Sequence, residues 1–184
     1  MHFPVTKRAS SGPKDSGFTL IEVLVSLVVF SIGLLGMAKL VLVSAHANDS
    51  AYLRSQATAL AYQILDNMRS NMSAATTNGY NTPLGATPAA PTSCVGTGTV
   101  CSPAQQAAWD VYSWTQHLNA ANNLGGGLPS GTGSVVTSAT VPVTATITVQ
   151  WDDSAAQCGF AASSAPCTIG AAVPMSVTLE TTLQ

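Results

Sequence analysis

The hydrophobic pattern of the chain is dominated by a long apolar run near its N-terminus. Residues 23–38, VLVSLVVFSIGLLGMA, contain no charged side chain. Residues 18–21 and 40–43 extend the run to membrane-spanning length, interrupted only by the charges of Glu22 and Lys39. Because a helix of about 20 apolar residues crosses the hydrocarbon core of a bilayer, the run predicts a membrane helix.

After the apolar run the pattern becomes amphipathic. Apolar residues recur at spacings of three and four, as on one face of a helix: Leu53, Ala57, Leu60, Ala61, Ile64, Leu65, Met68 and Met72. No proline occurs between Phe18 and Thr82, so no kink is encoded, and Gly33 and Gly36 are the only soft points. Residues 18 to about 72 are therefore predicted to form one long helix whose second half packs on a sheet.

The remaining residues predict a small head. Ser102-Pro103 is typical of a helix start, with an N-cap serine and a proline in the first turn. We expect a short helix from there to about Asn119, with Trp109, Tyr112 and Leu118 on one face. Apolar residues alternate with mostly threonine over 141–151 and 173–183, which predicts two antiparallel strands, and a weaker strand is expected over 133–138. The fold class is α+β: a long N-terminal helix, half membrane and half amphipathic, packed on a small antiparallel sheet.

Charge is scarce and unevenly placed. Charged residues make up 8% of the 184 residues, against about 25% in an ordinary soluble domain. The formal net charge of −2 leaves no basic footprint, so no nucleic-acid partner is expected. The first 17 residues carry three cations and one acid. Since a basic flank marks the cytoplasmic end of a membrane helix, the chain after the run should lie outside the cytoplasm.

Three interpretations of the apolar run differ in where the chain is cut. A secretory signal peptide would be released after Ala47, since Ala45-His46-Ala47 fits a small-x-small site. A permanent anchor would stay uncut. A cut between Gly17 and Phe18 would create an α-amino group four residues, or one helical turn, before Glu22. Only the third interpretation explains Glu22. Placing an acidic side chain in a membrane helix costs roughly 2.5–3.5 kcal/mol of free energy at the bilayer centre and less near its edge.

Residues 17–25, GFTLIEVLV, resemble the class III signal of type IV prepilins and type II secretion pseudopilins. The resemblance implies that an inner-membrane prepilin peptidase cuts after Gly17 and N-methylates Phe18, and that Glu22 is the assembly glutamate. Further segments are similar to the minor pilins called PilV: 50–62, 66–71, 101–104 and 149–153. One departure is Lys39, which stands where many major pilins carry a proline.

The resemblance also implies a division of the chain and a role. Residues 1–17 are the cleaved leader, 18–47 the membrane and filament-core helix, and 48–184 a periplasmic head. The expected protein is a non-catalytic minor pilin of the inner membrane and then the pilus, where it joins and helps initiate assembly. Its expected partners are other minor and major pilins, the prepilin peptidase/N-methyltransferase and the inner-membrane assembly platform. The alternatives are a type II secretion minor pseudopilin, a tip adhesin, or a binding domain released after Ala47.

Four cysteines are the remaining candidates for cross-links. Cys94 and Cys101 enclose six residues, and Cys158 and Cys167 enclose eight, neither of which is a zinc-ligand spacing. Disulfides are expected outside the cytoplasm. Three pairings are possible, and we favour the two local ones because each closes a loop rich in small residues. Each would add roughly 2–3 kcal/mol, and inert free thiols are the alternative.

Other chemistry is not indicated. The three histidines show no paired-ligand spacing, so neither a metal nor a cofactor is expected, and no catalytic motif appears. Asp152-Asp153 follows a predicted strand and is interpreted as a solvated turn rather than a calcium site. Trp109, Trp114 and Trp151 are expected to pack in the core rather than form an adhesive surface.

Overall fold

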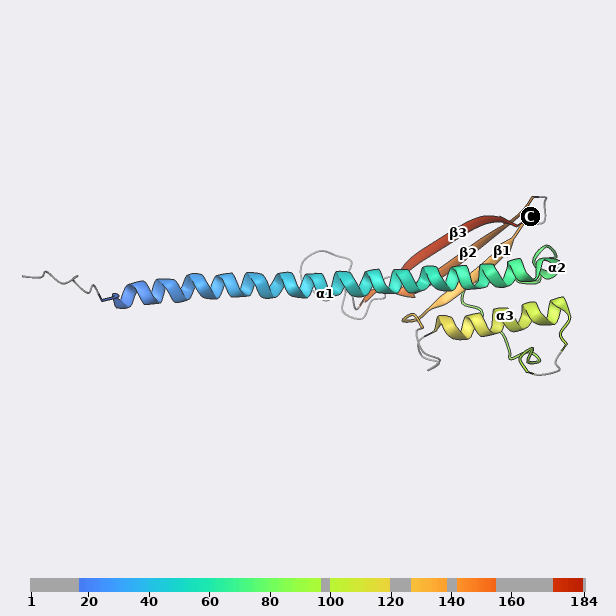
Figure 1. Ribbon diagram of the computed structural model, residues 1–184, viewed down its shortest axis with the longest axis horizontal. Coiled ribbons are helices and arrows are strands. Elements are labelled where there is room, and N and C mark those ends of the chain that lie inside the picture. The colour runs from blue at the N-terminus through green and yellow to red at the C-terminus, as the bar shows by residue number, and fades with distance from the viewer. Residues whose placement is uncertain (1–16, 97–99, 120–126, 139–141, 155–173, 184) are drawn as a thin grey trace, which may run out of the picture. The chain divides into compact units, whose positions relative to one another are not determined.

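The computed structural model describes residues 17–96, 100–119, 127–138, 142–154 and 174–183. The chain divides into two compact units, Met1–Leu42 and Val43–Gln184. The elements in chain order are α1 (Leu20–Ser70), α2 (Met72–Ala75), α3 (Pro103–Leu118), β1 (Thr132–Thr137), β2 (Val143–Asp152) and β3 (Pro174–Leu183) (Figure 1). The predicted fold class is confirmed, since a long N-terminal helix is followed by a small antiparallel sheet.

Helix α1 is continuous and passes through Gly33 and Gly36 without a break. It ends at Ser70, slightly before the predicted Met72, because the backbone of Asn71 leaves the helical region at φ −128° and ψ 56°. Asn71 then occupies the N-cap position of the one-turn helix α2, and its carbonyl accepts hydrogen bonds from the amides of Ala74 and Ala75. The two helices are therefore consecutive pieces of the pattern that the sequence presented as one.

In the first unit, the apolar part of α1 is bare. Every described residue from Gly17 to Leu42 is exposed, with Phe18 at 82% and Leu35 at 71%. Its most apolar 18-residue window has a mean hydropathy of 2.4. Within the described residues, α1 is the one helix long and apolar enough to cross a membrane, judged by length and composition. Such a surface requires lipid or other apolar helices around it.

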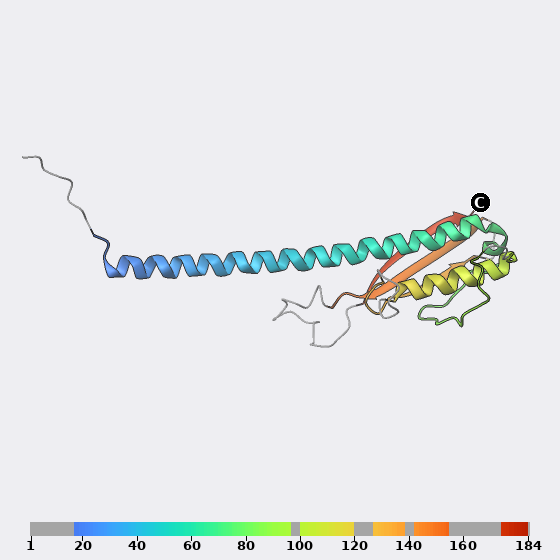
Figure 2. The ribbon, with the colours of Figure 1, turned by 60° about the horizontal axis from the view of Figure 1, so that its bottom comes forward.

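In the second unit, the later half of α1 supplies one wall of the core. The predicted stripe is confirmed, because Ala57, Ala61, Ile64, Leu65 and Met68 are buried and Leu53, Leu60 and Met72 pack beside them. Figures 1 and 2 show α3 running back alongside this half of α1. The two helices are joined directly, since the Trp114 indole nitrogen donates to the Leu60 carbonyl over 2.9 Å.

The sheet has the strand order β1-β2-β3, with both pairs antiparallel. Val135 of β1 lies opposite Ile147 of β2, which lies opposite Leu179 of β3. The predicted alternation is confirmed in β2, where every second residue is buried and the threonines lie on the other face. The buried residues are Val143, Ala145, Ile147, Val149 and Trp151. In β3 the alternation is present, but Met175, Val177 and Leu179 are only partly buried. The weaker predicted strand is also present as β1.

The start of α3 is as predicted, but its buried face is not. Ser102 is the N-cap, and its hydroxyl accepts from the Gln105 amide while the Gln105 side chain accepts from the Ser102 amide. The predicted face of Trp109, Tyr112 and Leu118 is wrong for the two aromatic residues, which are half-buried and pack against each other with ring centroids 5.9 Å apart. The buried stripe follows helical spacing instead: Ala107, Asp110, Val111, Trp114 and Leu118.

The contact between β1 and α3 depends on a glycine. A Cβ atom at Gly133 would lie 2.7 Å from Leu118 Cδ1 and 3.0 Å from Trp114 Cζ2. Gly133 itself is buried in β1. The absence of a side chain therefore sets how closely the sheet approaches α3.

We predict that Gly133→Val lowers the free energy of unfolding of the head by about 1–3 kcal/mol, because the added side chain must displace the Trp114 ring or the strand. Chemical unfolding of the full chain in detergent, followed by tryptophan fluorescence, measures the change. Val136→Thr is the matched control, since Val136 lies in the same strand with its side chain exposed. Equal stability of the Gly133 variant and the control would contradict the proposed close approach.

Candidate functional site

The segment that precedes α1 is accessible. Gly17, Phe18 and Thr19 are exposed and lie outside any helix or strand. A Cβ atom added at Gly17 would meet nothing within 4 Å. The peptide bond between Gly17 and Phe18 is therefore accessible to an enzyme from its C-terminal side. The leader residues before Gly17 lie outside the described residues.

The first turn of α1 is organised by Thr19. Its carbonyl accepts hydrogen bonds from the amides of Glu22 and Val23 at 3.1 and 3.3 Å, and its hydroxyl accepts weakly from the Glu22 amide at 3.4 Å. Glu22 thus lies in the first helical turn. A negative charge there is favoured by the partial positive charge of the helix N-terminus.

Phe18 and Glu22 lie on the same side of this turn. Both line one surface hollow, together with Val23, Ser26, Leu27 and Phe30. In the described part of the chain, no side chain pairs with the Glu22 carboxylate. The nearby hydroxyls bond within the helix, since Ser26 donates to the Glu22 carbonyl over 2.6 Å and Ser31 to the Leu27 carbonyl over 2.7 Å.

The comparisons with known proteins concern this stretch. Residues 12–38 match the family model of the prokaryotic N-terminal methylation motif, which spans Gly17, Phe18 and Glu22. The chain carries a class III prepilin-type signal. The signal indicates a type IV pilin-like or pseudopilin protein, and such proteins are structural and non-catalytic. Together with the apolar helix, it indicates membrane anchoring and processing by a prepilin peptidase. No curated protein and no solved structure matches the chain.

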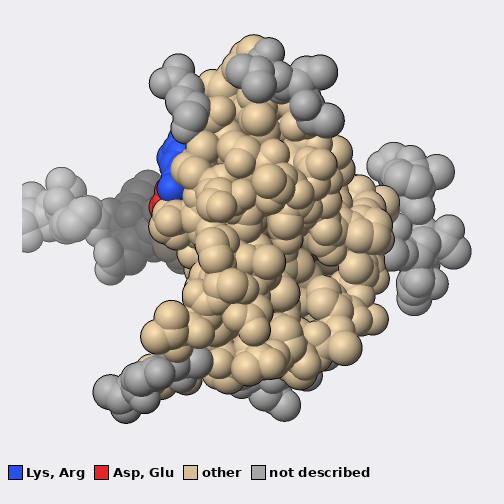
Figure 3. Space-filling model, turned by 90° about the vertical axis from the view of Figure 1, so that its right-hand side faces the viewer, with Lys and Arg blue, Asp and Glu red and all other residues tan. Residues whose placement is uncertain are grey.

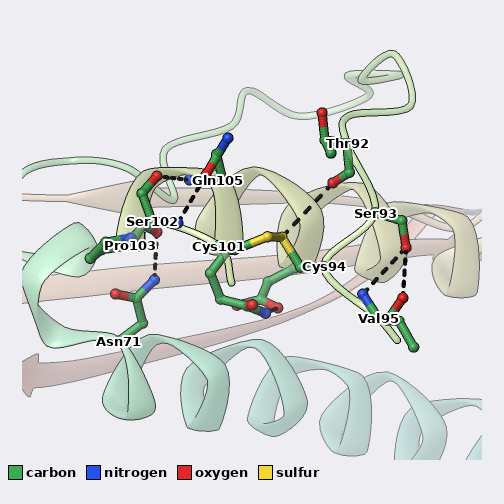
Figure 4. Close-up of a disulfide and its surroundings, with 11 residues drawn as sticks. Asn71, Thr92, Ser93, Cys94, Val95, Cys101, Ser102, Pro103 and Gln105 are labelled. Atoms are coloured by element: carbon green, nitrogen blue, oxygen red, sulfur yellow. Dashed lines mark hydrogen bonds between the residues drawn. A yellow bond between two sulfur atoms is a disulfide. The ribbon is translucent and has the colours of Figure 1, made fainter. Parts of the chain in front are cut away.

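Beyond the signal, a disulfide joins Cys94 to Cys101, with Cα atoms 5.9 Å apart. This is one of the two pairings that the sequence favoured, and Cys158 and Cys167 lie outside the described residues. Figure 4 shows the bridge next to the start of α3, because Cys101 directly precedes the N-cap Ser102. The Asn71 side chain also reaches this point and donates to the Pro103 carbonyl over 2.8 Å. The loop before α3 is thus tied at the same place where α1 ends.

A buried polar cluster under this junction was not found from the sequence. Tyr80 is fully buried, and its hydroxyl donates to Asp110 Oδ2 over 2.7 Å. Gln106 donates to the other carboxylate oxygen over 2.7 Å, and Asn71 donates to the Tyr80 hydroxyl over 3.3 Å. Burial and the hydrogen bond to Asp110 raise the pKa of the Tyr80 phenol above its ordinary value of 10.0. The sequence held one sign of this cluster, because Asp110 occurs among the apolar residues of the buried stripe of α3.

The Asp152-Asp153 pair is not the solvated turn that was expected. Asp153 is fully buried at the end of β2, and its Oδ2 accepts a hydrogen bond from the Ser50 hydroxyl of α1 over 2.7 Å. Asp152 Oδ1 accepts from the Ser154 amide over 2.9 Å. Asp153 therefore links the sheet to α1. Among the residues that the structure describes, no three histidine, cysteine or acidic side chains come together as a metal site.

The three tryptophans occupy two kinds of position. Trp114 and Trp151 are buried in the core as predicted, with 1% and 3% exposure. Trp109 is half-buried on the side of α3 that does not face the core. The expectation of core packing is therefore correct for two of the three.

We predict that the stability of the head falls above about pH 10 through Tyr80, because the unfolded phenol ionises there while the folded phenol stays protonated. The loss reaches at most about 1.4 kcal/mol per pH unit. Denaturant unfolding of the full chain in detergent from about pH 9 to about pH 12 should give a flatter profile for Tyr80→Phe than for wild type. Tyr112→Phe retains Tyr80 and should keep the wild-type slope. Identical slopes for Tyr80→Phe and wild type would exclude this role for the phenol.

Proposed function

We propose that this chain is a minor pilin that joins and helps initiate assembly of a type IV pilus. The observation that carries the proposal is the signal itself. An exposed glycine-phenylalanine bond directly precedes a bare apolar helix, and the acid near the start of this helix has no side-chain partner among the described residues. In this proposal Gly17 precedes the cut, Phe18 becomes the N-methylated terminus and Glu22 is the assembly residue.

The energetics favour a specific role for Glu22. Moving an apolar helix from lipid into a bundle of similar helices exchanges one apolar environment for another, so little hydrophobic free energy changes. A carboxylate that gains an ammonium partner is different, because a charged hydrogen bond in a poorly solvated site contributes about 1.5–3 kcal/mol. The partner is the amine of Phe18, either its own or that of the subunit next to it in the filament. This pairing would set the axial register of the subunit, as a buried polar group does in a coiled coil.

The proposed topology is a single span with residues 1–17 in the cytoplasm and the head in the periplasm. The basic leader supports this orientation. The Cys94–Cys101 disulfide supports it too, because disulfides persist in oxidising compartments such as the periplasm. After processing, the subunit leaves the membrane through the assembly platform together with other pilins.

The released-domain alternative fits the structure less well. Residues 45–47 lie in the middle of α1, which continues for more than twenty residues beyond Ala47 as one helix. A cut there would divide the helix whose later half forms the core of the head. A type II secretion pseudopilin carries the same signal, and the similarity of 50–62 and 149–153 to PilV minor pilins favours the pilus.

We predict that the mature protein begins with N-methyl-Phe18. Mass spectrometry of the membrane-extracted native protein should show the loss of residues 1–17 and the addition of one methyl group. Gly17→Ala should leave the folded chain unchanged, since the position is open, yet should accumulate as the full-length precursor. A wild-type terminus at Asn48 or an intact leader would contradict the proposal.

We predict that Glu22→Ala inserts into the membrane normally but enters the filament poorly. Loss of one charged hydrogen bond predicts at least about a tenfold decrease in the pilins that co-purify with it. Ser26→Ala is the matched control, because Ser26 lines the same hollow and bonds only to the helix backbone. Co-purification of Glu22→Ala at the wild-type level would contradict the mechanism.

Deletion of the gene distinguishes a type IV pilus subunit from a type II secretion pseudopilin. Loss of pili would indicate a minor pilin, and loss of secretion would indicate a pseudopilin.

A further inference from the structure

The two edge strands of the sheet, β1 and β3, differ in whether other described residues pair with their outer edge. The outer edge of β1 is closed by the segment that follows α2. The Thr82 amide donates to the Val135 carbonyl over 2.9 Å, and the Val135 amide donates to the Thr82 carbonyl over 3.0 Å. The Thr137 amide donates to the Asn81 side chain over 2.9 Å. Backbone groups that would otherwise attract another strand are thus satisfied within the chain.

The outer edge of β3 has no such cover among the described residues. β3 pairs with β2 along its whole length, from Pro174 opposite Asp152 to Leu183 opposite Val143. Beyond β3, the described part of the chain contributes neither a strand nor a β-bridge. Because alternate residues of an antiparallel strand direct their N–H and C=O groups away from the partner, about half of the backbone groups of β3 face outward.

This edge also lacks the features that usually prevent pairing. Protected edge strands are short, bulged, or carry lysine or an interior proline. β3 has ten residues, pairs one to one without a bulge, and contains proline only at its first position, Pro174. Glu180 is its only charged residue. The strand therefore offers a long and regular row of donors and acceptors.

The packing under β3 is incomplete in the same place. Met175, Val177 and Leu179 point to the core side of the sheet but are only partly buried. In β2, by contrast, Ala145, Ile147 and Val149 are 0% exposed. A fourth strand beside β3 would cover the exposed part of this apolar row, as β3 does for β2.

Charge indicates the kind of strand that fits. The head unit, Val43–Gln184, contains two arginines and six acidic residues, a net charge of −4. Figure 3 shows a face of the molecule that is almost free of charged atoms, with only a small group of basic and acidic atoms at its margin. A second copy of the head would bring the same negative charge, whereas a basic side chain opposite the exposed Glu180 would be attracted.

We propose that the free edge of β3 is a docking site for an extended segment of a different protein chain. The segment adds to the sheet as a fourth strand, with a basic residue opposite Glu180 and apolar residues over Val177 and Leu179. Backbone hydrogen bonds supply the affinity, and the side chains on the two faces supply the specificity.

Residue-resolved amide hydrogen exchange on the full chain in detergent tests this proposal directly. The probe is a peptide of about ten residues, matched to strand length, in which valine and threonine alternate around one central lysine. An otherwise identical peptide with glutamate at the centre is its partner. We expect the lysine peptide to slow exchange of alternate β3 amides by about fivefold or more, with little effect of the glutamate peptide and no change in β1.

Two substitutions make the test specific. Glu180→Lys should reverse the preference, so that the glutamate peptide gives the stronger protection. Val136→Lys places the same charge on the closed edge strand, where the side chain is exposed, and should keep the wild-type pattern.

Three results would overturn the proposal. Absence of protection by both peptides would show that the edge does not accept a strand. Slow exchange of all β3 amides in the chain alone would show that a segment of this chain already covers the edge. Protection that rises with protein concentration without peptide would assign the edge to a second copy.

Discussion

Burial of one stripe of α1 is the interaction on which the described head depends. The sheet and α3 share one hydrophobic core with this stripe, in which Ala57 and Ala61 are fully buried. The remaining contacts refine it: Trp114 bonds to the backbone of α1, Asp153 accepts from Ser50, and Asn71 reaches the start of α3. The head is thus assembled around a helix whose N-terminal portion belongs to a different environment.

That N-terminal portion imposes the opposite requirement on the same helix. Its surface is apolar on all sides and exposed in the described chain, so it is stable only in lipid or among similar helices. The acid at Glu22 is unfavourable in the first environment and useful in the second if an amine is supplied. The signal, the bare helix and the position of the acid all agree with the proposed mechanism, in which proteolysis would create an amine that pairs with the Glu22 carboxylate.

Most of the fold could be predicted from the sequence because its elements are long and regularly patterned. The stripe of α1 and the alternation in β2 and β3 extend over enough residues to define a face. The face of α3 was mispredicted because Trp109 and Tyr112 are the most conspicuous apolar residues there, whereas smaller residues at Ala107 and Val111 determine the packing. Asp153 was misplaced because its partner is 103 residues away, and no local pattern reveals such a contact.

The residues of the candidate site were found from a short motif rather than from periodicity. Gly17, Phe18 and Glu22 occur within six positions, so their proximity follows from the chain itself. The structure adds that all three are exposed and that Phe18 and Glu22 line one hollow. The Tyr80–Asp110 cluster required the tertiary structure, because three separate segments meet there.

The hydrogen bond from Trp114 to the Leu60 carbonyl has a consequence for the rotation of α1 about its own axis. A surface of alanines alone is nearly uniform, so a helix could turn by one ridge and still pack acceptably. The Trp114 indole donates to a single carbonyl, that of Leu60, and so favours one rotational setting of α1 about its axis. The same carbonyl also accepts the helical hydrogen bond from the following turn. Replacing Trp114 with phenylalanine would keep much of the packed volume but remove this contact, so that the Ser50–Asp153 hydrogen bond and the buried side chains of α1 alone would fix the rotation of the helix.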